Sequence, residues 1–148
     1  MSGLFFEELN IPEPDVNLAA GGGSQAEQTA SIMVAFEKYL MQHPTDMVMV
    51  VGDVTSTMAC AIVAKKMCIP LAHVEAGIRS FDMTMPEEVN RIVTDSLTDY
   101  FFITSAYAKE NLKNNGVPDE KVFFVGNVMI DSSEFPFVGF FLATLYAT

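Results

Sequence analysis

Residues 47–57, MVMVVGDVTST, decide the fold class of this 148-residue chain. Five consecutive apolar residues, bounded by Asp46 and Gly52, predict a strand that is covered on both faces, as in a parallel sheet. The glycine permits a sharp turn, and residues 55–67 then have the composition of a helix. Because ligands of open α/β sheets bind beyond the carboxyl ends of the strands, this stretch also predicts where chemistry takes place.

The same alternation of strand and helix continues on both sides of this stretch. Ser24 and Glu27 predict a capping box for a helix that Pro44 ends, and Pro86 opens another helix. Such alternation implies right-handed βαβ crossovers, so we expect an α/β fold, a Rossmann-like parallel sheet flanked by helices. The further elements expected are strands at 15–20, 70–74, 100–104 and 121–125, helices at 86–97 and 105–115, and the end of a helix at 3–9.

Composition and charge exclude several classes of function. The net charge is −11 and the sequence has no basic cluster, so nucleic-acid binding is disfavoured. No apolar stretch reaches the roughly 20 residues of a membrane-spanning helix, and residues 1–9 lack the features of a secretory signal. We therefore expect a cytoplasmic protein without a membrane span. Cys60 and Cys68 lack metal-ligand spacing, so we expect no metal site and two free, buried thiols.

Two acidic residues directly follow predicted strands. Asp53 lies just before a helix, where a ligand or catalytic role is one interpretation and capping of that helix by Asp53, Thr55 or Ser56 is the other. Glu75 follows the strand at 70–74, and a partly desolvated carboxylate there suits general acid–base chemistry. The alternative for Glu75 is a structural ion pair with Arg79.

The helix expected at 86–97 begins with charged and polar residues. Acids beside the positive end of a helix are ordinary structure, so Glu87 and Glu88 taken alone are interpreted as helix-dipole partners. Asn90 and Arg91, on the next turn, are expected to form a solvated face.

Two further features favour structural interpretations. His73, inside an apolar strand, is expected to be a core histidine with satisfied hydrogen bonds. Residues 21–26, GGGSQA, formally fit the GxGxxA pattern of dinucleotide-binding loops. The strand before this segment is poor, and no acidic residue ends the next strand at the expected spacing, so dinucleotide binding is disfavoured.

Four motifs occur in an order and at a spacing that point to one family. They are GDVTST (52–57), HVEAGIRS (73–80), MPEEVNR (85–91) and VGNVMID (125–131), and FFEELNIP (5–12) with AEQT (26–29) adds a looser match. Together they make residues 2–132 resemble a non-hydrolysing UDP-N-acetylglucosamine 2-epimerase. Each motif alone is modest, whereas four in order are a specific signal.

The resemblance implies one domain of a GT-B-like architecture, in which two Rossmann-like domains face each other across a cleft. It also implies an isomerase that interconverts UDP-GlcNAc and UDP-ManNAc. The mechanism proposed for the family removes the C2 proton and expels UDP to give a 2-acetamidoglucal, after which UDP adds back. This chemistry implies no cofactor and no metal, and intact family members are expected to be homo-oligomers that bind a UDP-sugar.

Six residues match the family's site by motif. They are the acidic catalytic residues Asp53, Glu75 and Glu87, and the expected substrate-binding residues Ser56, Arg79 and Arg91. The chemistry agrees, because moving a proton on and off a weakly acidic carbon from both faces needs at least two positioned acid–base groups. Which carboxylate serves which face of the sugar stays open.

The sequence also departs from the family pattern. The initial strand with its GTRPE-type turn is absent, so the sheet is expected to lack its first, central strand. Residues 1–132 would form a partial N-terminal Rossmann-like domain. Residues 133–148 would form an apolar tail unlike the family. This tail is interpreted as a segment that packs on the sheet, as out-of-frame translation or as an aggregation-prone end. Cys68 stands where the family usually has glycine.

Three functional interpretations follow from these observations. The first is an epimerase-family chain that retains the acid–base half of the site and is inactive alone. The second is a non-catalytic module that binds a sugar nucleotide or pairs with a full-length paralogue. The third is an unrelated flavodoxin-like switch or a GT-B transferase fragment, which HVEAGIRS followed by MPEEVNR disfavours.

Overall fold

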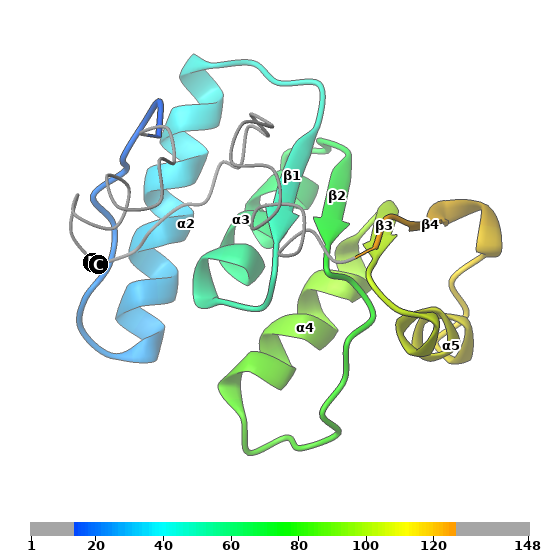
Figure 1. Cartoon of the computed structure of the whole chain (residues 1–148). Helices are drawn as coiled ribbons and strands as arrows, with labels where there is room; N and C mark the ends of the chain where they lie inside the picture. Colours follow the sequence, from blue (N-terminus) through cyan, green and yellow to red (C-terminus); the bar gives the residue numbers. More distant parts are fainter. Residues whose placement is uncertain (1–13, 127–148) are drawn as a thin grey trace.

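The apolar run after Asp46 forms a strand, and four of the five strands expected from the sequence are present within one residue at each end. The computed structural model describes residues 14–126, so the helix end expected at 3–9 lies outside the described residues. Figure 1 shows how helix and strand alternate. The elements are α2 (Gln25–Gln42), β1 (Val48–Val51), α3 (Thr55–Lys66), β2 (Leu71–Val74), α4 (Pro86–Leu97), β3 (Tyr100–Ile103), α5 (Ala106–Asn114), the 3₁₀ turn η1 (Asp119–Lys121) and β4 (Val122–Phe124).

The four strands form one parallel sheet in the order β1-β2-β3-β4, which confirms the predicted α/β class. Val50 of β1 lies beside His73 of β2, and Phe101 continues this row on β3. Because all four strands run the same way, their carboxyl ends meet at one edge of the sheet. Among the described residues β1 pairs only with β2.

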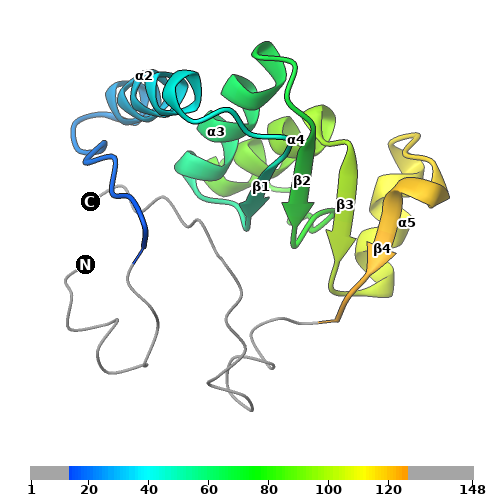
Figure 2. The ribbon, with the colours of Figure 1, turned by 90° about the horizontal axis from the view of Figure 1, so that it is seen from above.

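Helices α3, α4 and α5 cover one face of this sheet, and α2 packs against α3 (Figure 2). The main core lies between α2, α3 and the first two strands, where Ile32, Ala59 and Leu71 are at most 2% exposed. A second cluster joins β3 to α5 and includes Phe101 and Leu112. The helices thus hold the strands from one side and leave their carboxyl ends open to the loops.

The opposite face of the sheet carries apolar side chains that no helix of residues 14–126 covers. Met49, Tyr100 and Phe123 are each at least 40% exposed there. Phe102 stacks on Phe123 with their ring centroids 5.5 Å apart. In the same part of the chain, no helix is both long enough and apolar enough to cross a membrane.

The start of α2 confirms the predicted capping box. The backbone N–H of Glu27 donates to Ser24 Oγ at 3.3 Å, and the N–H of Ser24 donates to Glu27 Oε2 at 2.8 Å. Gly23 has a φ of +79°, and a Cβ there would lie 2.7 Å from Glu27 Oε2. The capping box therefore accounts for this glycine without a bound phosphate.

The strand expected at 15–20 was wrong, because these residues have no regular secondary structure. The backbone N–H of Ala19 donates to Asn17 Oδ1 at 2.8 Å, and Ala19 itself has a φ of 48°. Asparagine side chains often bond their own backbone two residues on, which competes with strand pairing. The local turn of Asn17 therefore takes the place of a strand here.

Only one of the two free cysteines has the burial expected of it. Cys60 is buried, and its burial raises the pKa of its thiol to about 12, so it is an inert core residue. Cys68 is exposed, which corrects the sequence expectation. It follows the last turn of α3 with a φ of 61°, the left-handed conformation in which helices usually end on glycine.

Replacing Cys68 with glycine is expected to stabilise the protein by about 0.5–1 kcal/mol. The left-handed conformation costs an L-residue about 1–2 kcal/mol, and the greater freedom of glycine in the unfolded chain offsets part of that gain. Urea unfolding followed by circular dichroism measures the difference. Cys68→Ala is the control, because it removes the thiol but keeps the Cβ, and equal stabilisation by both variants would contradict the strain argument.

Candidate functional site

The loops after β1 and β2 and the first turns of α4 meet at the carboxyl edge of the sheet, at the bottom of Figure 1. Asp53 follows β1, Glu75 follows β2, and Glu87 lies exposed in the first turn of α4. A Cβ built on Gly52 would lie 3.8 Å from Glu75 Oε2. The Glu75 side chain is therefore directed toward the turn that carries Asp53.

Asp53 is held by α4 rather than by the helix that follows it. Arg91 Nε donates to Asp53 Oδ2 at 3.0 Å, and Asn90 Nδ2 donates to the Asp53 carbonyl at 2.8 Å. The guanidinium of Arg91 is largely buried, with 14% of the side chain exposed, whereas the Asp53 carboxylate keeps 34% exposure. Asn90 and Arg91 were wrongly expected to form a solvated face, because their partners come from a distant loop.

The capping interpretation for residues 53–56 was also wrong. The N-cap of α3 is Val54, which has no side chain able to cap, and no side-chain bond closes this end. Thr57 Oγ1 instead donates to the Val51 carbonyl at 2.7 Å, which holds the first turn of α3 against β1. The Asp53 carboxylate is thus free of a capping role and faces Arg91.

Glu75 occupies an unusual backbone conformation. Its φ is 69°, and Gly77, two residues later, has a φ of 77°. A residue other than glycine in the left-handed region is uncommon and costs about 1–2 kcal/mol. Such outliers persist only where the surroundings hold them, and they cluster at functional sites.

The alternative ion pair between Glu75 and Arg79 was wrong. Arg79 Nη1 lies 2.6 Å from Asp95 Oδ2, and the side chains of both residues are only 5% exposed. The same Arg79 nitrogen donates to the Ile78 carbonyl at 2.7 Å. The guanidinium is therefore enclosed by the protein, so its contacts are structural. Ser56, the other expected substrate-binding residue on this side, is 7% exposed.

His73 is a satisfied core histidine, as predicted. It is 1% exposed, its Nδ1 lies 2.7 Å from Asp95 Oδ1, and its Nε2 lies 2.9 Å from the Gly52 carbonyl oxygen. Asp95 also accepts from the backbone N–H of Gly77 at 3.1 Å. One carboxylate of α4 thus connects β2, the loop after β2 and the turn after β1.

Glu88 lies in the first turn of α4, where a helix-dipole partner was expected, but its side chain is buried. Its carboxylate accepts from the backbone N–H of Ser80 at 2.9 Å and of Phe81 at 3.1 Å, and from Arg91 Nη1 at 2.9 Å. Burial opposes ionisation, but these hydrogen bonds outweigh it and lower the pKa of Glu88 to about 2. The ionised Glu88 therefore anchors the loop after β2 and Arg91 together.

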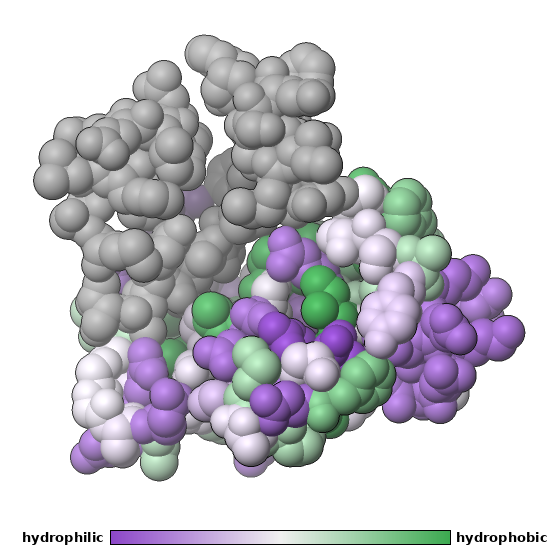
Figure 3. Space-filling view, turned by 60° about the horizontal axis from the view of Figure 1, so that its bottom comes forward, coloured by the Kyte–Doolittle hydropathy of each residue, from purple (hydrophilic) through white to green (hydrophobic). Residues whose placement is uncertain are grey.

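The surface at this end of the molecule is mixed in character. In Figure 3, which brings the bottom of Figure 1 forward, hydrophilic residues gather on the α5 side, and hydrophilic and apolar residues alternate toward the centre. No group of three or more His, Cys, Asp or Glu within residues 14–126 is arranged to hold a metal ion. The described groups that can act chemically at this edge include the carboxylates of Asp53, Glu75 and Glu87 and the guanidinium of Arg91.

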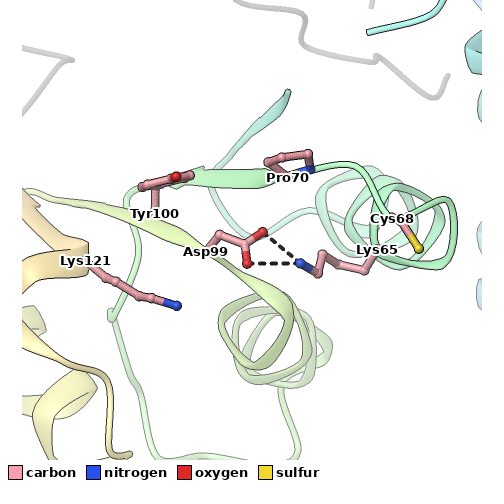
Figure 4. A pocket seen from close by; sticks show the side chains of 6 residues that line it. All are labelled: Lys65, Cys68, Pro70, Asp99, Tyr100 and Lys121. Atoms are coloured by element: carbon pink, nitrogen blue, oxygen red, sulfur yellow. Dashed lines mark hydrogen bonds and ion pairs between the residues drawn. The ribbon is translucent and has the colours of Figure 1, made fainter. Parts of the chain in front are cut away.

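A hollow of about 270 Å³ lies at the other end of the strands (Figure 4). Lys65 Nζ donates to both carboxylate oxygens of Asp99 there, at 2.8 and 3.0 Å, and Pro70 and Tyr100 stand at strand starts. The hollow therefore lies on the amino side of the sheet, opposite Asp53 and Glu75. Ligands of open α/β sheets bind at the carboxyl ends of the strands, so this hollow does not compete as the candidate site.

A family model described as UDP-N-acetylglucosamine 2-epimerase matches residues 1–141. The chain belongs to this epimerase family. The UDP-N-acetylglucosamine 2-epimerase of Methanocaldococcus jannaschii is 46% identical over 133 residues, which are 90% of this chain and 36% of that protein. The UDP-2,3-diacetamido-2,3-dideoxy-D-glucuronate 2-epimerase of Pseudomonas aeruginosa is 44% identical over 137 residues, 91% of this chain and 39% of that protein.

Solved structures of the epimerase family agree with this assignment. The crystal structure of the M. jannaschii enzyme in complex with UDP-GlcNAc and UDP superimposes with a TM-score of 0.86 at 46% identity, and it covers 90% of this chain and 37% of that one. A UDP-GlcNAc 2-epimerase from Neisseria meningitidis bound to UDP-GlcNAc gives a TM-score of 0.80 at 32% identity, covering 84% and 35%. The chain spans little more than a third of the length of the curated relatives reported above.

The sequence did not predict that two residues of α4 hold the loop after β2 in place by hydrogen bonds. Glu88 and Asp95 had no assigned partner. In the structure Glu88 accepts from two backbone N–H groups of the loop after β2, and Asp95 accepts from one. A signal did exist, because 88, 91 and 95 are spaced to lie on one face of a helix. That face is polar and buried, while Val89 and Ile92 of α4 are 39% and 38% exposed.

Proposed function

We propose that this chain supplies the acid–base half of a UDP-N-acetylglucosamine 2-epimerase site, with Asp53, Glu75 and Glu87 as its catalytic carboxylates. The observation that carries the proposal is the convergence of Asp53 and Glu75 at one edge of the sheet. Glu75 Oε2 approaches Gly52, the neighbour of Asp53 in the chain. Membership of the epimerase family and the sugar-nucleotide complexes of its relatives support the substrate class.

The geometry suits proton transfer at a carbon next to the leaving group. Glu75 and Asp53 both keep partial exposure at the open edge, so a sugar ring can reach them. Arg91 holds the Asp53 carboxylate, and Asp95 holds the turn after Glu75 at the Gly77 N–H. Two positioned carboxylates allow one to remove the C2 proton and another to return it on the opposite face. Glu87, exposed on the first turn of α4, would approach from a third side.

The substrate-binding part of the proposal rests on fewer residues. Arg91 contacts both Asp53 and Glu88, so it sets the orientation of a catalytic carboxylate and adds positive charge beside an anionic substrate. Ser56 and Arg79 are enclosed, and their proposed contribution is to the shape of the two loops. A cytoplasmic location and a homo-oligomeric assembly belong to the same proposal.

A chimeric epimerase tests the proposal. The part of the M. jannaschii enzyme that matches this chain is replaced by the matching residues of this chain, and UDP-ManNAc formation in D₂O is followed by NMR. We expect turnover with deuterium incorporated at C2, and a loss of about 10²–10⁴-fold in kcat for Glu75→Gln. The chain alone is expected to show no turnover, because the reacting groups are aligned only when both sides of the site enclose the substrate.

Glu110→Gln is the matched control for this experiment. Glu110 is an exposed residue of α5, so its substitution changes the same charge away from the carboxyl edge. The chimera carrying Glu110→Gln should retain the activity of the unmodified chimera. Equal turnover of the Glu75→Gln and Glu110→Gln chimeras would contradict the assignment of Glu75.

A further inference from the structure

We propose that Asp95, a buried carboxylate of α4, is a positioning residue that holds Glu75 in its left-handed backbone conformation and so aims the Glu75 side chain at the Gly52–Asp53 turn. This inference rests on the proposed function, because it assigns a task to Glu75 as a catalytic group. It goes beyond that function in naming the group that sets the geometry.

The backbone of Glu75 is strained. A φ of 69° disfavours any residue with a Cβ, roughly tenfold relative to an ordinary conformation. Glycine would remove the strain, yet the chain has glutamate at this position. The conformation therefore has to be held by contacts elsewhere in the turn.

Asp95 contacts this turn at several points. Its carboxylate accepts from the Gly77 N–H at 3.1 Å, two residues after Glu75, and pairs with Arg79 Nη1 at 2.6 Å, four residues after it. It also lies 2.7 Å from Nδ1 of His73, two residues before Glu75. Asp95 thus bonds to the chain on both sides of the strained residue.

The contacts of Asp95 extend to the turn that carries Asp53. Through Nε2, at 2.9 Å, His73 contacts the carbonyl oxygen of Gly52, the residue before Asp53. From the other side, Asn111 Nδ2 of α5 donates to the Gly77 carbonyl at 2.9 Å and limits where the turn can move. Asp95 is 7% exposed, so these bonds form away from water, where a missing partner is costly.

A comparison of alanine and glycine at position 75 in the full chain tests the proposal. Both Glu75→Ala and Glu75→Gly remove the carboxylate, so their difference in stability reports the backbone conformation alone. With Asp95 present, Glu75→Gly should have a folding equilibrium constant about threefold larger than Glu75→Ala, because only alanine is strained. When Asp95→Asn is added, the turn can relax to an ordinary backbone conformation. The folding equilibrium constant of Glu75→Ala should then be about threefold larger than that of Glu75→Gly.

Asp99→Asn is the matched control. Asp99 also bonds a backbone N–H, that of Leu71 at 2.9 Å, and a cation, Lys65, but at the opposite edge of the sheet. With Asp99→Asn added, Glu75→Gly should remain more stable than Glu75→Ala. A glycine advantage that survives Asp95→Asn, or that Asp99→Asn also reverses, would overturn the proposal.

NMR of the full chain supplies a spectroscopic readout. At positive φ the amide proton and Hα of one residue are close, so Glu75 should give a strong intraresidue cross-peak that weakens in Asp95→Asn and not in Asp99→Asn. In the unmodified chain, the Gly77 amide should exchange at least about 100-fold more slowly than an unstructured glycine. Unprotected exchange of Gly77 would overturn the proposal even if Asp95→Asn fails to fold.

None of these measurements uses a sugar nucleotide. An inactive chimera would therefore contradict the epimerase proposal while leaving the positioning of Glu75 by Asp95 to be decided by stability and NMR. A failed positioning test would, in turn, leave the epimerase proposal standing.

Discussion

Replacing Gly77 with alanine is expected to destabilise the protein by about 3 kcal/mol or more. Gly77 has a φ of +77°, and an added Cβ would lie 2.6 Å from the carbonyl oxygen of Ala108 and 2.9 Å from Leu112 Cγ. Left-handed strain costs about 1–2 kcal/mol, and overpacking of a buried site adds about 1–3 kcal/mol. Because the nearest atom belongs to the backbone of α5, it cannot move aside as a flexible side chain would.

Gly116→Ala separates the cost of backbone strain from the cost of overpacking. Gly116 also has a positive φ, of +81°, but no atom lies within 4 Å of a Cβ added there. Its substitution should therefore cost only the strain, about 1–2 kcal/mol. Urea unfolding followed by circular dichroism gives both values. Equal losses of stability for the two variants would contradict the close contact between position 77 and α5.

Replacing Glu88 with glutamine is expected to remove about 2–3 kcal/mol of stability at pH 7 and to flatten the acid limb of the stability curve. The pKa of Glu88 is lowered from 4.5 to about 2, because hydrogen bonds from Ser80, Phe81 and Arg91 outweigh the cost of burial. Lowering the pKa from 4.5 to about 2 corresponds to an upper bound of about 3–4 kcal/mol. Glutamine keeps the shape of the side chain but loses the charge that Arg91 contacts.

The contribution of Glu88 to the free energy of unfolding decreases as the pH falls. Glu88 contributes its full stabilisation above pH 4.5, and the contribution is lost as the pH falls from there to about 2. The difference in unfolding free energy between the unmodified chain and Glu88→Gln should therefore shrink over this range. Glu87→Gln, at the exposed neighbouring position, is the control and should follow the unmodified chain. A difference that stays constant with pH would contradict this account of Glu88.

Much of the fold could be predicted from the sequence because the signals for its helices and strands come from residues close together in the chain. Apolar runs of strand length, the capping box of Ser24 and Glu27, and Pro86 at a helix start depend on neighbours within a few residues. The strand expected at 15–20 was wrong for an equally local reason, because Asn17 bonds the backbone of Ala19. The location of Asp53 and Glu75 at one edge then followed from the parallel order of the strands.

The partners within the site could not be predicted in this way. Helix α4 turns Glu88, Asn90 and Asp95 inward and leaves Val89 and Ile92 outward, the reverse of an ordinary amphipathic helix. Burying those polar groups is favourable only because loops far away in sequence supply their hydrogen bonds. Periodicity alone carries no information about such partners.

The sequence by itself therefore determined the parallel α/β sheet, the edge at which chemistry is expected and the acidic residues placed there. Only the tertiary structure decided that Arg79 pairs with Asp95 and not with Glu75, and that Glu75 sits in a left-handed turn. Strand and helix signals arise from short-range preferences of the chain. The orientation of a buried charge is set instead by the lowest-energy arrangement of donors and acceptors that folding brings together from distant segments.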